Sequence, residues 1–120
     1  MIAASPVLYS ADLRGCRALP GMPPASIVDA FVGALEAAGA TIVQRTWHCF
    51  PDAGLTCVLI LSESHAVLHT WPENGTINLD IFSCSPRLDS VAAIEALGRV
   101  FGAGQASVQE TPRAPFESRR

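Results

Sequence analysis

The chain has 120 residues, 49% of them hydrophobic, and a formal net charge of −3 that comes from eight Lys or Arg and eleven Asp or Glu. This length allows one compact domain, residues 1–120, and is too short for two, and the scattered charges form no basic stripe, so we expect no nucleic-acid partner. The longest apolar run, residues 57–61, is far shorter than the roughly 20 residues that span a membrane, and the N-terminus lacks a signal-peptide pattern, so we expect a soluble, cytoplasmic protein with no membrane partner.

The first predicted element is a helix that begins near Ser26 and runs to about Ala38. Ser26 is placed to cap it, and Asp29 three residues later completes a capping box at the positive end of the helix dipole. Gly39 supplies the left-handed residue that ends it. The apolar residues recur at helical spacing and predict one face that packs on a sheet: Ile27, Val28, Phe31, Leu35 and Ala38.

Four strands are predicted next. Residues 40–47 are β-branched and alternating, and the loop 48–54 follows them. Residues 55–62 contain a run that looks buried on both faces. Residues 66–71 and 76–83 flank a turn at Pro72 to Gly75, so this part of the chain is expected to form an antiparallel meander.

A second helix is predicted from about Pro86 to Phe101, with Ser85 or Ser90 as its cap. Gly102 and Gly104 end it. Its expected core face is formed by Leu88, Val91, Ile94, Leu97 and Phe101. A weak last strand at residues 106–110 precedes a tail, residues 111–120, that we expect to be frayed.

Together these elements predict an α+β fold, a two-layer sandwich in which two helices cover one face of a mostly antiparallel sheet. The other face of the sheet must also be covered. A second copy of the chain is the simplest partner, because a shared sheet face would bury the remaining apolar surface of both copies. We therefore expect a homodimer.

The four cysteines show no CxxC pairing and lie in a domain that does not need disulfides, so we expect reduced thiols. Cys16, Cys49 and Cys57 lie in apolar segments. Because free cysteine is among the most buried residue types, we expect these three to be core residues. Cys84 belongs to the motif described next.

The segment richest in reactive side chains is residues 61–73, LSESHAVLHTWPE, followed by residues 80–84, DIFSC. These two segments hold three Ser, two His, two Glu and a Cys in one short span. The order and spacing of these residues resemble the bacterial S-adenosylmethionine decarboxylase family, whose members cut themselves to make a pyruvoyl cofactor. The upstream residues His48-x-Phe50 and Gly54-x-Thr56 also fit the family's spacing.

Carried onto this chain, the resemblance implies that the Ser64 oxygen attacks the carbonyl of Glu63 and that the bond between them is cut. The products would be a β chain, residues 1–63, and an α chain, residues 64–120, beginning with a covalent pyruvoyl group derived from Ser64. Such a strained nucleophile needs a neighbouring group to take and return protons. The resemblance gives His65 no separate role, and we leave it outside the catalytic set.

Five further residues match functional positions of the family. His69 matches the base of self-cleavage, and Thr56 a hydroxyl residue that supports it, although Thr at a strand start is also ordinary β-sheet chemistry. Cys84 matches the donor that protonates the decarboxylated product, a role that suits a thiol with a tunable pKa. Phe50 and Glu73 match the positions that stack on adenine and accept the ribose hydroxyls. No metal ligand is assigned.

The chain departs from the family's pattern near the expected substrate pocket. Residues 7–9 replace a Gly-x-His-Leu element, and the loop 50–54 reads FPDAG where Phe-Ser-Pro-Gln-Gly is usual. Ser85 replaces a common glycine, and residues 74–76 read NGT in place of Tyr-Gly-Tyr. These changes leave the cofactor-forming residues intact and alter the pocket.

The resemblance therefore predicts a pyruvoyl-dependent decarboxylase of polyamine biosynthesis that converts S-adenosylmethionine to its decarboxylated form and CO2. One alternative keeps this machinery and shifts its specificity to ornithine or arginine, with Asp52 or Glu73 facing the distal amine. A second alternative is a regulatory paralogue that does not cleave. Retention of Ser64, His69 and Cys84 argues against it, because such a paralogue has no chemical need of them.

Overall fold

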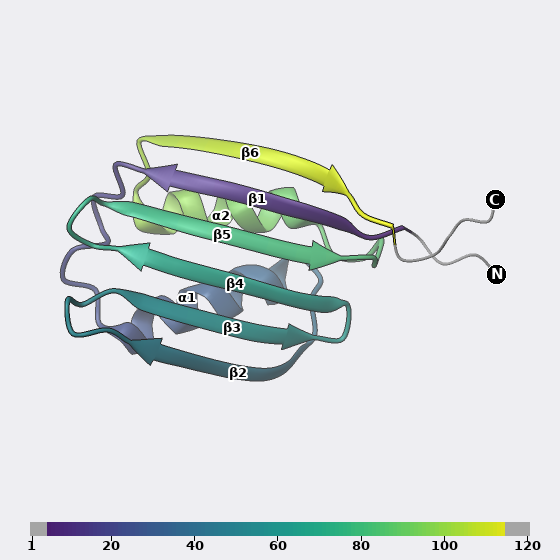
Figure 1. The fold of residues 1–120 in the computed structure, drawn as a ribbon, viewed down its shortest axis with the longest axis horizontal. Coiled ribbons are helices and arrows are strands. Elements are labelled where there is room, and N and C mark those ends of the chain that lie inside the picture. Colours follow the sequence, from purple (N-terminus) through teal and green to yellow (C-terminus); the bar gives the residue numbers. More distant parts are fainter. Residues whose placement is uncertain (1–4, 115–120) are drawn as a thin grey trace.

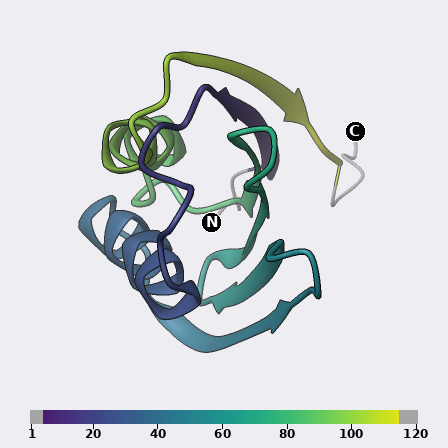
Figure 2. The same ribbon diagram turned by 90° about the vertical axis from the view of Figure 1, so that its left-hand side faces the viewer.

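The computed structural model describes residues 5–114, which form six strands and two helices. The helices lie together on one side of a curved sheet (Figures 1 and 2), so the predicted α+β two-layer architecture is confirmed. In chain order the elements are β1 (Val7–Arg14), α1 (Pro24–Ala37), β2 (Ile42–Cys49), β3 (Leu55–Leu61), β4 (Ser64–Trp71), β5 (Thr76–Ser83), α2 (Ser90–Phe101) and β6 (Gln105–Pro112).

The sheet has the strand order β2-β3-β4-β5-β1-β6, and each neighbouring pair is antiparallel. Strands β2 to β5 are the predicted meander. Strand β1, which the sequence analysis did not predict, lies between β5 and β6 (Figure 1). Its signal was a short alternation in which Ala11 and Leu13 face the core and Ser10 and Asp12 do not.

Both helix starts differ from the prediction. Helix α1 begins two residues before Ser26, with Pro23 at its N-cap and no side-chain cap, because proline in the first turn already has the backbone angle that a helix needs. Helix α2 begins at Ser90 and is capped by neither predicted serine. The Asp89 carboxylate accepts a hydrogen bond from the Ala92 N–H at 3.0 Å, and aspartate is among the preferred N-cap residues.

The glycines that follow the helices behave as predicted. Gly102 has φ +67° at the end of α2, and Gly39 has φ +110° just after α1. Gly39 also lies against the segment that leads into α2, where an added Cβ would be 2.1 Å from the Arg87 carbonyl oxygen. A side chain at this position is therefore excluded by sterics as well as by backbone angle.

Three strands extend beyond their predicted limits. Strand β2 runs to Cys49 and β4 begins at Ser64. Strand β6 continues to Pro112, because Thr111 and Pro112 pair with the start of β1. The start of the tail predicted to be frayed is thus part of the sheet, while residues 115–120 lie outside the described residues.

The core lies between the helices and the inner face of the sheet. Its largest fully buried side chains are Leu13, Leu19, Phe31, Leu35, Leu55, Leu59, Leu68, Ile77, Leu79, Ile81, Ile94 and Phe101. Burying each of them contributes about 1.5–3 kcal/mol. Val91, placed by the sequence analysis on the core face of α2, is instead exposed. Neither helix of residues 5–114 is long and apolar enough to cross a bilayer.

Within residues 5–114 no helix covers the other face of the sheet, which faces the viewer in Figure 1. Alternation along the strands turns Ile60, Val67, Trp71 and Phe82 toward this side. Ile60 and Trp71 are 41% and 40% exposed. This surface, which we call the open face, carries the candidate site.

Candidate functional site

The turn between β3 and β4 is tied down at two points. It consists of Ser62 and Glu63, since Leu61 and Ser64 on either side are already paired. The Glu63 side chain is buried, and its Oε1 accepts the Thr41 N–H at 3.1 Å. The Ser62 N–H donates to the Thr41 carbonyl oxygen at 3.0 Å. The bond predicted to be cut therefore lies next to an anchored residue.

Ser64 has an unusual backbone conformation. Its φ is +153°, and Ala53 is the other non-glycine residue between positions 5 and 114 with positive φ. Such angles cost on the order of 1–3 kcal/mol in a residue with a Cβ and persist only when the surroundings hold them. The strain thus falls on the residue whose oxygen is predicted to act as nucleophile, and that oxygen lies 3.3 Å from His65 Nδ1.

Cys84 lies at the same end of the sheet as Ser64. It directly follows Ser83, the residue that pairs with Ser64 across β4 and β5. Its thiol is exposed and borders a small cavity of about 190 Å³ that Ser85 and Tyr9 also line. The sheet register therefore brings the predicted nucleophile and the predicted proton donor to the same end of the sheet.

The other thiols have different surroundings. Cys16 and Cys57 are buried, as predicted. Burial raises the pKa of Cys57 to about 11, even though the positive charge of Arg45 acts in the opposite direction, and burial also raises the pKa of Cys16. Cys49, predicted to be buried, is exposed, because β2 is an edge strand whose residues 43–49 are all exposed.

His69 and Thr56 form a second cluster. The β3–β4 register sets them opposite each other, and Thr56 Oγ1 lies 2.6 Å from His69 Nδ1. His69 is five residues from Ser64 along β4, which is roughly 17 Å at the rise of an extended strand. A regular strand would also put the two positions on opposite faces, but the positive φ of Ser64 departs from that pattern. The structure thus pairs Thr56 with His69 and places Cys84 next to the strand partner of Ser64, but these two groups of residues lie at different ends of β4 in one chain.

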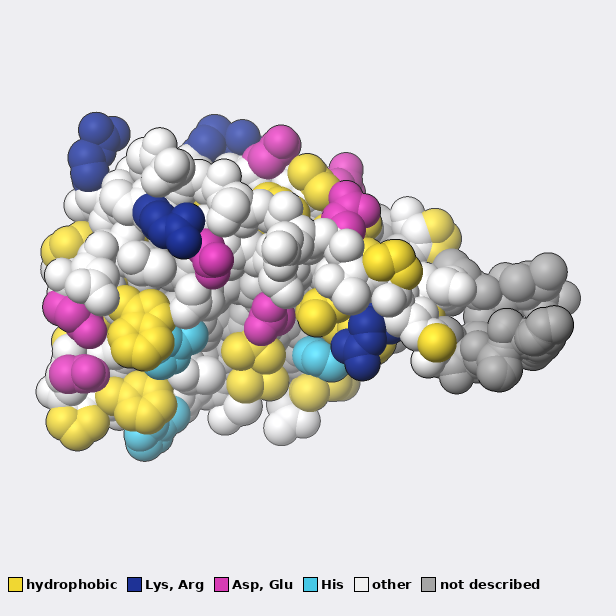
Figure 3. All heavy atoms as spheres, turned by 45° about the horizontal axis from the view of Figure 1, so that its top comes forward, with side chains coloured by type: hydrophobic (Ala, Val, Ile, Leu, Met, Phe, Trp, Pro, Cys, Tyr) yellow, Lys and Arg dark blue, Asp and Glu magenta, His cyan; other side chains and the backbone are white. Residues whose placement is uncertain are grey.

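The histidine next to Ser64 and the histidine paired with Thr56 have different aromatic neighbours. His65 stacks on Phe82, with ring centroids 5.3 Å apart. His69 lies against Trp71, with centroids 4.4 Å apart. Figure 3 shows that histidine side chains lie next to large apolar ones at two distant places on the surface.

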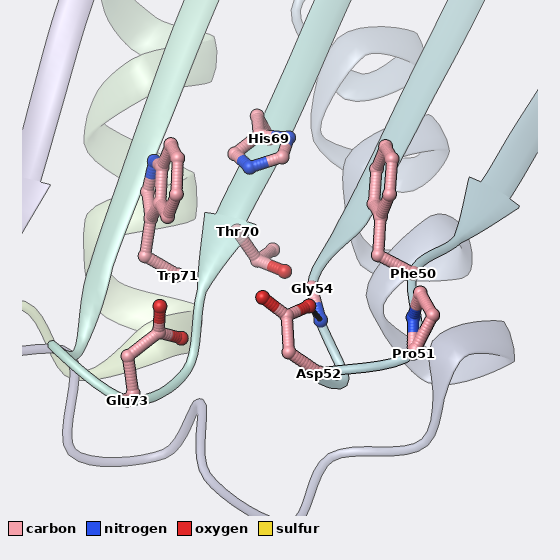
Figure 4. Close-up of a pocket in the computed structure, with 8 residues that line it drawn as sticks. All are labelled: Phe50, Pro51, Asp52, Gly54, His69, Thr70, Trp71 and Glu73. Atoms are coloured by element: carbon pink, nitrogen blue, oxygen red, sulfur yellow. Dashed lines mark hydrogen bonds between the residues drawn. The ribbon is translucent and has the colours of Figure 1, made fainter.

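A cavity of about 440 Å³ opens beside His69, and its walls are labelled in Figure 4. Phe50 and Trp71 stand on opposite sides with His69 between them (Figure 4). The Trp71 indole N–H donates to Asn78 Oδ1 at 2.7 Å, which fixes the plane of that ring. Trp71 was not among the predicted site residues, although its alternation with His69 along β4 puts both side chains on the open face.

Two carboxylates lie at the edge of the same cavity. Glu73 comes from the β4–β5 turn and Asp52 from the β2–β3 loop (Figure 4). Asp52 Oδ1 accepts the Gly54 N–H at 3.1 Å, and the Phe50 N–H donates to the Gly54 carbonyl at 2.7 Å, so this loop is held in one shape. Phe50 and Glu73, predicted to bind one ligand, therefore line one cavity.

Comparison with known proteins gives the class of the chain. A family model described as S-adenosylmethionine decarboxylase matches residues 8–114. The chain is similar to S-adenosylmethionine decarboxylase proenzymes of Acidithiobacillus ferrooxidans (39% identity over 76% of this chain and 68% of the relative) and Syntrophomonas wolfei (35% identity over 89% and 85%). These matches define a carboxy-lyase class.

A solved structure gives the fold alone. The adenosylmethionine decarboxylase of Aquifex aeolicus superimposes with a TM-score of 0.82 at 24% identity and covers 99% of this chain and 98% of its own. The chain belongs to the S-adenosylmethionine decarboxylase family, as its motif predicted.

Proposed function

We propose that this chain is a proenzyme that cuts itself between Glu63 and Ser64 and then decarboxylates S-adenosylmethionine. The observation that carries the proposal is the positive φ of Ser64 directly after a buried, hydrogen-bonded Glu63. A strained nucleophile next to a residue whose side chain is anchored suits an attack on the preceding carbonyl. The family's proenzyme relatives support it.

The cleavage chemistry uses only atoms of the chain and one water. The Ser64 oxygen attacks the Glu63 carbonyl carbon, the peptide C–N bond breaks, and an ester forms. Removal of the Ser64 α-proton then breaks the bond between the Ser64 Cβ and the ester oxygen. The leaving group is the main-chain carboxylate of Glu63, which becomes the C-terminus of the β chain. Water displaces ammonia from the remaining unsaturated end and leaves a pyruvoyl group at position 64. We assign removal of the α-proton to His69, which Thr56 Oγ1 orients.

The surroundings of Ser64 suit a pyruvoyl group. Position 64 is only partly buried, and the neighbouring thiol of Cys84 is exposed. Such a group supplies the electron sink that pyridoxal phosphate supplies in other decarboxylases. Cys84 Sγ then delivers a proton to the substrate carbon that has lost CO2.

The proposal requires two copies of the chain, because Ser64 and His69 lie at opposite ends of β4. If two open faces pack with their strands running in opposite directions, the Ser64 end of one copy meets the His69 end of the other. A two-fold axis then makes two identical sites. The exposed Ile60 and Trp71 supply apolar area for such an interface.

A mixture of variants tests the shared site. Ser64→Ala removes the nucleophile and His69→Ala removes the base, so each variant alone is expected to remain uncut or to stop at the ester. When the two are co-expressed, mixed dimers hold one complete site. The His69→Ala chain is then expected to be cut to a pyruvoyl end, and its failure to be cut in purified mixed dimers would contradict a site shared between copies.

The cavity next to His69 suits an adenosyl group. Stacking on an aromatic side chain is worth about 1–3 kcal/mol per base, and Phe50 and Trp71 offer two such faces. The Glu73 carboxylate can accept hydrogen bonds from ribose hydroxyls. We therefore assign the adenosyl end of the substrate to this cavity.

Intact mass under denaturing conditions, followed by CO2 release, tests the proposal. We expect two fragments. The second should be lighter, by the mass of one ammonia, than residues 64–120 beginning with an unmodified serine. We then expect CO2 from S-adenosylmethionine. Release from ornithine or arginine instead would show that the pocket has changed specificity. A chain that stays uncut and releases no CO2 would contradict the proposal and favour a regulatory paralogue.

A further inference from the structure

We propose that His65 is the general base that removes the proton from the Ser64 hydroxyl in the first step of self-cleavage. The inference rests on the proposed function and adds a residue to it. Self-cleavage needs two deprotonations, one at the Ser64 oxygen and one at its α-carbon. His69 is assigned to removal of the α-proton. No residue has yet been assigned to removal of the hydroxyl proton.

The geometry places His65 next to the hydroxyl. Ser64 Oγ lies 3.3 Å from His65 Nδ1, just beyond the roughly 2.6–3.2 Å reach of a general base, and such hydrogen bonds often tighten only as the reaction begins. In a regular strand these consecutive side chains would point to opposite faces. The positive φ of Ser64 breaks that regularity at the residue where the contact forms.

The imidazole is held by its surroundings. His65 pairs with Phe82 across β4 and β5, and their rings stack at an interplanar angle of 30°. The Arg113 guanidinium carbon lies 5.8 Å from the centroid of the Phe82 ring. A ring fixed in this way keeps Nδ1 directed at Ser64 without the entropic cost of orienting a free side chain.

His69 cannot serve the first step in the same chain. It lies roughly 17 Å along the strand, and its Nδ1 is engaged by Thr56 Oγ1 at 2.6 Å. His65 carries its own Nδ1 next to the nucleophile before any partner binds. The two proton removals are thus assigned to different histidines. His65 acts on the hydroxyl next to it, and His69, which lies at the other end of β4, acts on the α-proton.

The step is balanced. As Ser64 Oγ bonds to the Glu63 carbonyl carbon, its proton moves to His65 Nδ1, which accepts it in the tautomer that carries hydrogen on Nε2. The C–N bond between the two residues then breaks, and the proton passes from Nδ1 to the departing Ser64 nitrogen. An amide has become an ester and a free amine, with no atom gained or lost.

His65→Phe is the sharpest variant, because it keeps an aromatic ring on Phe82 and removes both nitrogens. Freshly synthesised wild-type and variant chains are followed by denaturing gel and intact mass. General-base catalysis contributes about 100- to 10,000-fold, and we expect cleavage of the variant to slow by at least about 100-fold. Imidazole added to His65→Ala should restore part of the rate. His65→Gln gives the same comparison without the ring if the Phe variant unfolds.

Hydroxylamine separates the two histidines. Under mild conditions it cleaves an ester far faster than a peptide bond, so it should release an α chain that begins with intact Ser64 from His69→Ala, which stops after the first step, and intact mass distinguishes this fragment from a cut at Asn74-Gly75. His65→Phe should accumulate no ester and remain insensitive. Cleavage of His65→Phe at the wild-type rate, or ester accumulation in it, would overturn the role of His65. A wild-type chain that never cuts would instead overturn the proposed function.

Discussion

Removal of the Glu63 carboxylate should weaken both the fold and self-cleavage. Glu63→Ala deletes the acceptor of the Thr41 N–H and leaves the turn with one anchor, the bond from Ser62 N–H to the Thr41 carbonyl. A hydrogen bond to a charged group is worth about 1.5–3 kcal/mol. Thr41 is exposed, so water can reach its freed N–H, and we expect a loss at the lower end of that range, about 1.5–2 kcal/mol.

The same free energy bears on cleavage. The strained backbone conformation of Ser64 costs on the order of 1–3 kcal/mol, which is similar to the free energy of the Glu63 hydrogen bond that helps to hold it. Without this hydrogen bond, the turn can relax toward an ordinary strand conformation. A shift of about 1.4 kcal/mol lowers the strained population about tenfold, so the cleavage rate should fall by about that factor.

Two assays measure these effects. Stability is obtained by urea unfolding of Glu63→Ala made together with Ser64→Ala, so that the chain stays in one piece. Cleavage of Glu63→Ala alone is followed by intact mass. Glu63→Gln keeps an Oε1 acceptor for the Thr41 N–H and is the matched control. Equal unfolding midpoints and cleavage rates for the Ala and Gln variants would refute an anchoring role for Glu63.

Three further effects are expected. Gly39→Ala should destabilise the fold by roughly 2–4 kcal/mol in urea unfolding, since its Cβ would lie 2.1 Å from the Arg87 carbonyl oxygen, whereas Gly33→Ala, with no atom within 4 Å, should be neutral or stabilising; equal effects would count against the steric reason. Phe50→Ala should raise KM for S-adenosylmethionine about 5- to 150-fold, as loss of about 1–3 kcal/mol of stacking predicts, and Phe50→Trp should recover most of it; an unchanged KM would exclude stacking on this ring. Because burial raises the folded-state pKa of Cys57 from 9.0 to about 11, its contribution to stability is complete below pH 9 and is lost as pH rises toward 11, and this loss should be absent in Cys57→Ala.

The sequence specified most of the sheet, because alternation is strong where large residues face the core. Ile77, Leu79 and Ile81 of β5 are examples. Strand β1 was missed because its inward positions include the small Ala11, which gives a weak hydrophobic signal. The helix starts were misplaced because several residues near each start could cap, and local geometry decides among them.

The site was predictable as a set of residues but not as an arrangement. The motif identified Ser64 and His69. The resemblance to the family identified Phe50 and Glu73, which line one cavity. The predicted strand began at residue 66, so the sequence did not show that Ser64 and His69 lie on one strand, roughly 17 Å apart. What the sequence could not give was the conformation of the turn, because the strain at Ser64 depends on a contact with Thr41, which is 22 residues from Glu63.

The place of β1 has a consequence for a chain cut after Glu63. Strands β1 to β3 would belong to one fragment and β4 to β6 to the other, yet β1 lies between β5 and β6. The two pieces would be interleaved, and their separation would break the ladders β3–β4, β1–β5 and β1–β6. Unfolding would then release two molecules instead of one, so refolding would be a second-order reaction, and the midpoint of unfolding would rise with protein concentration.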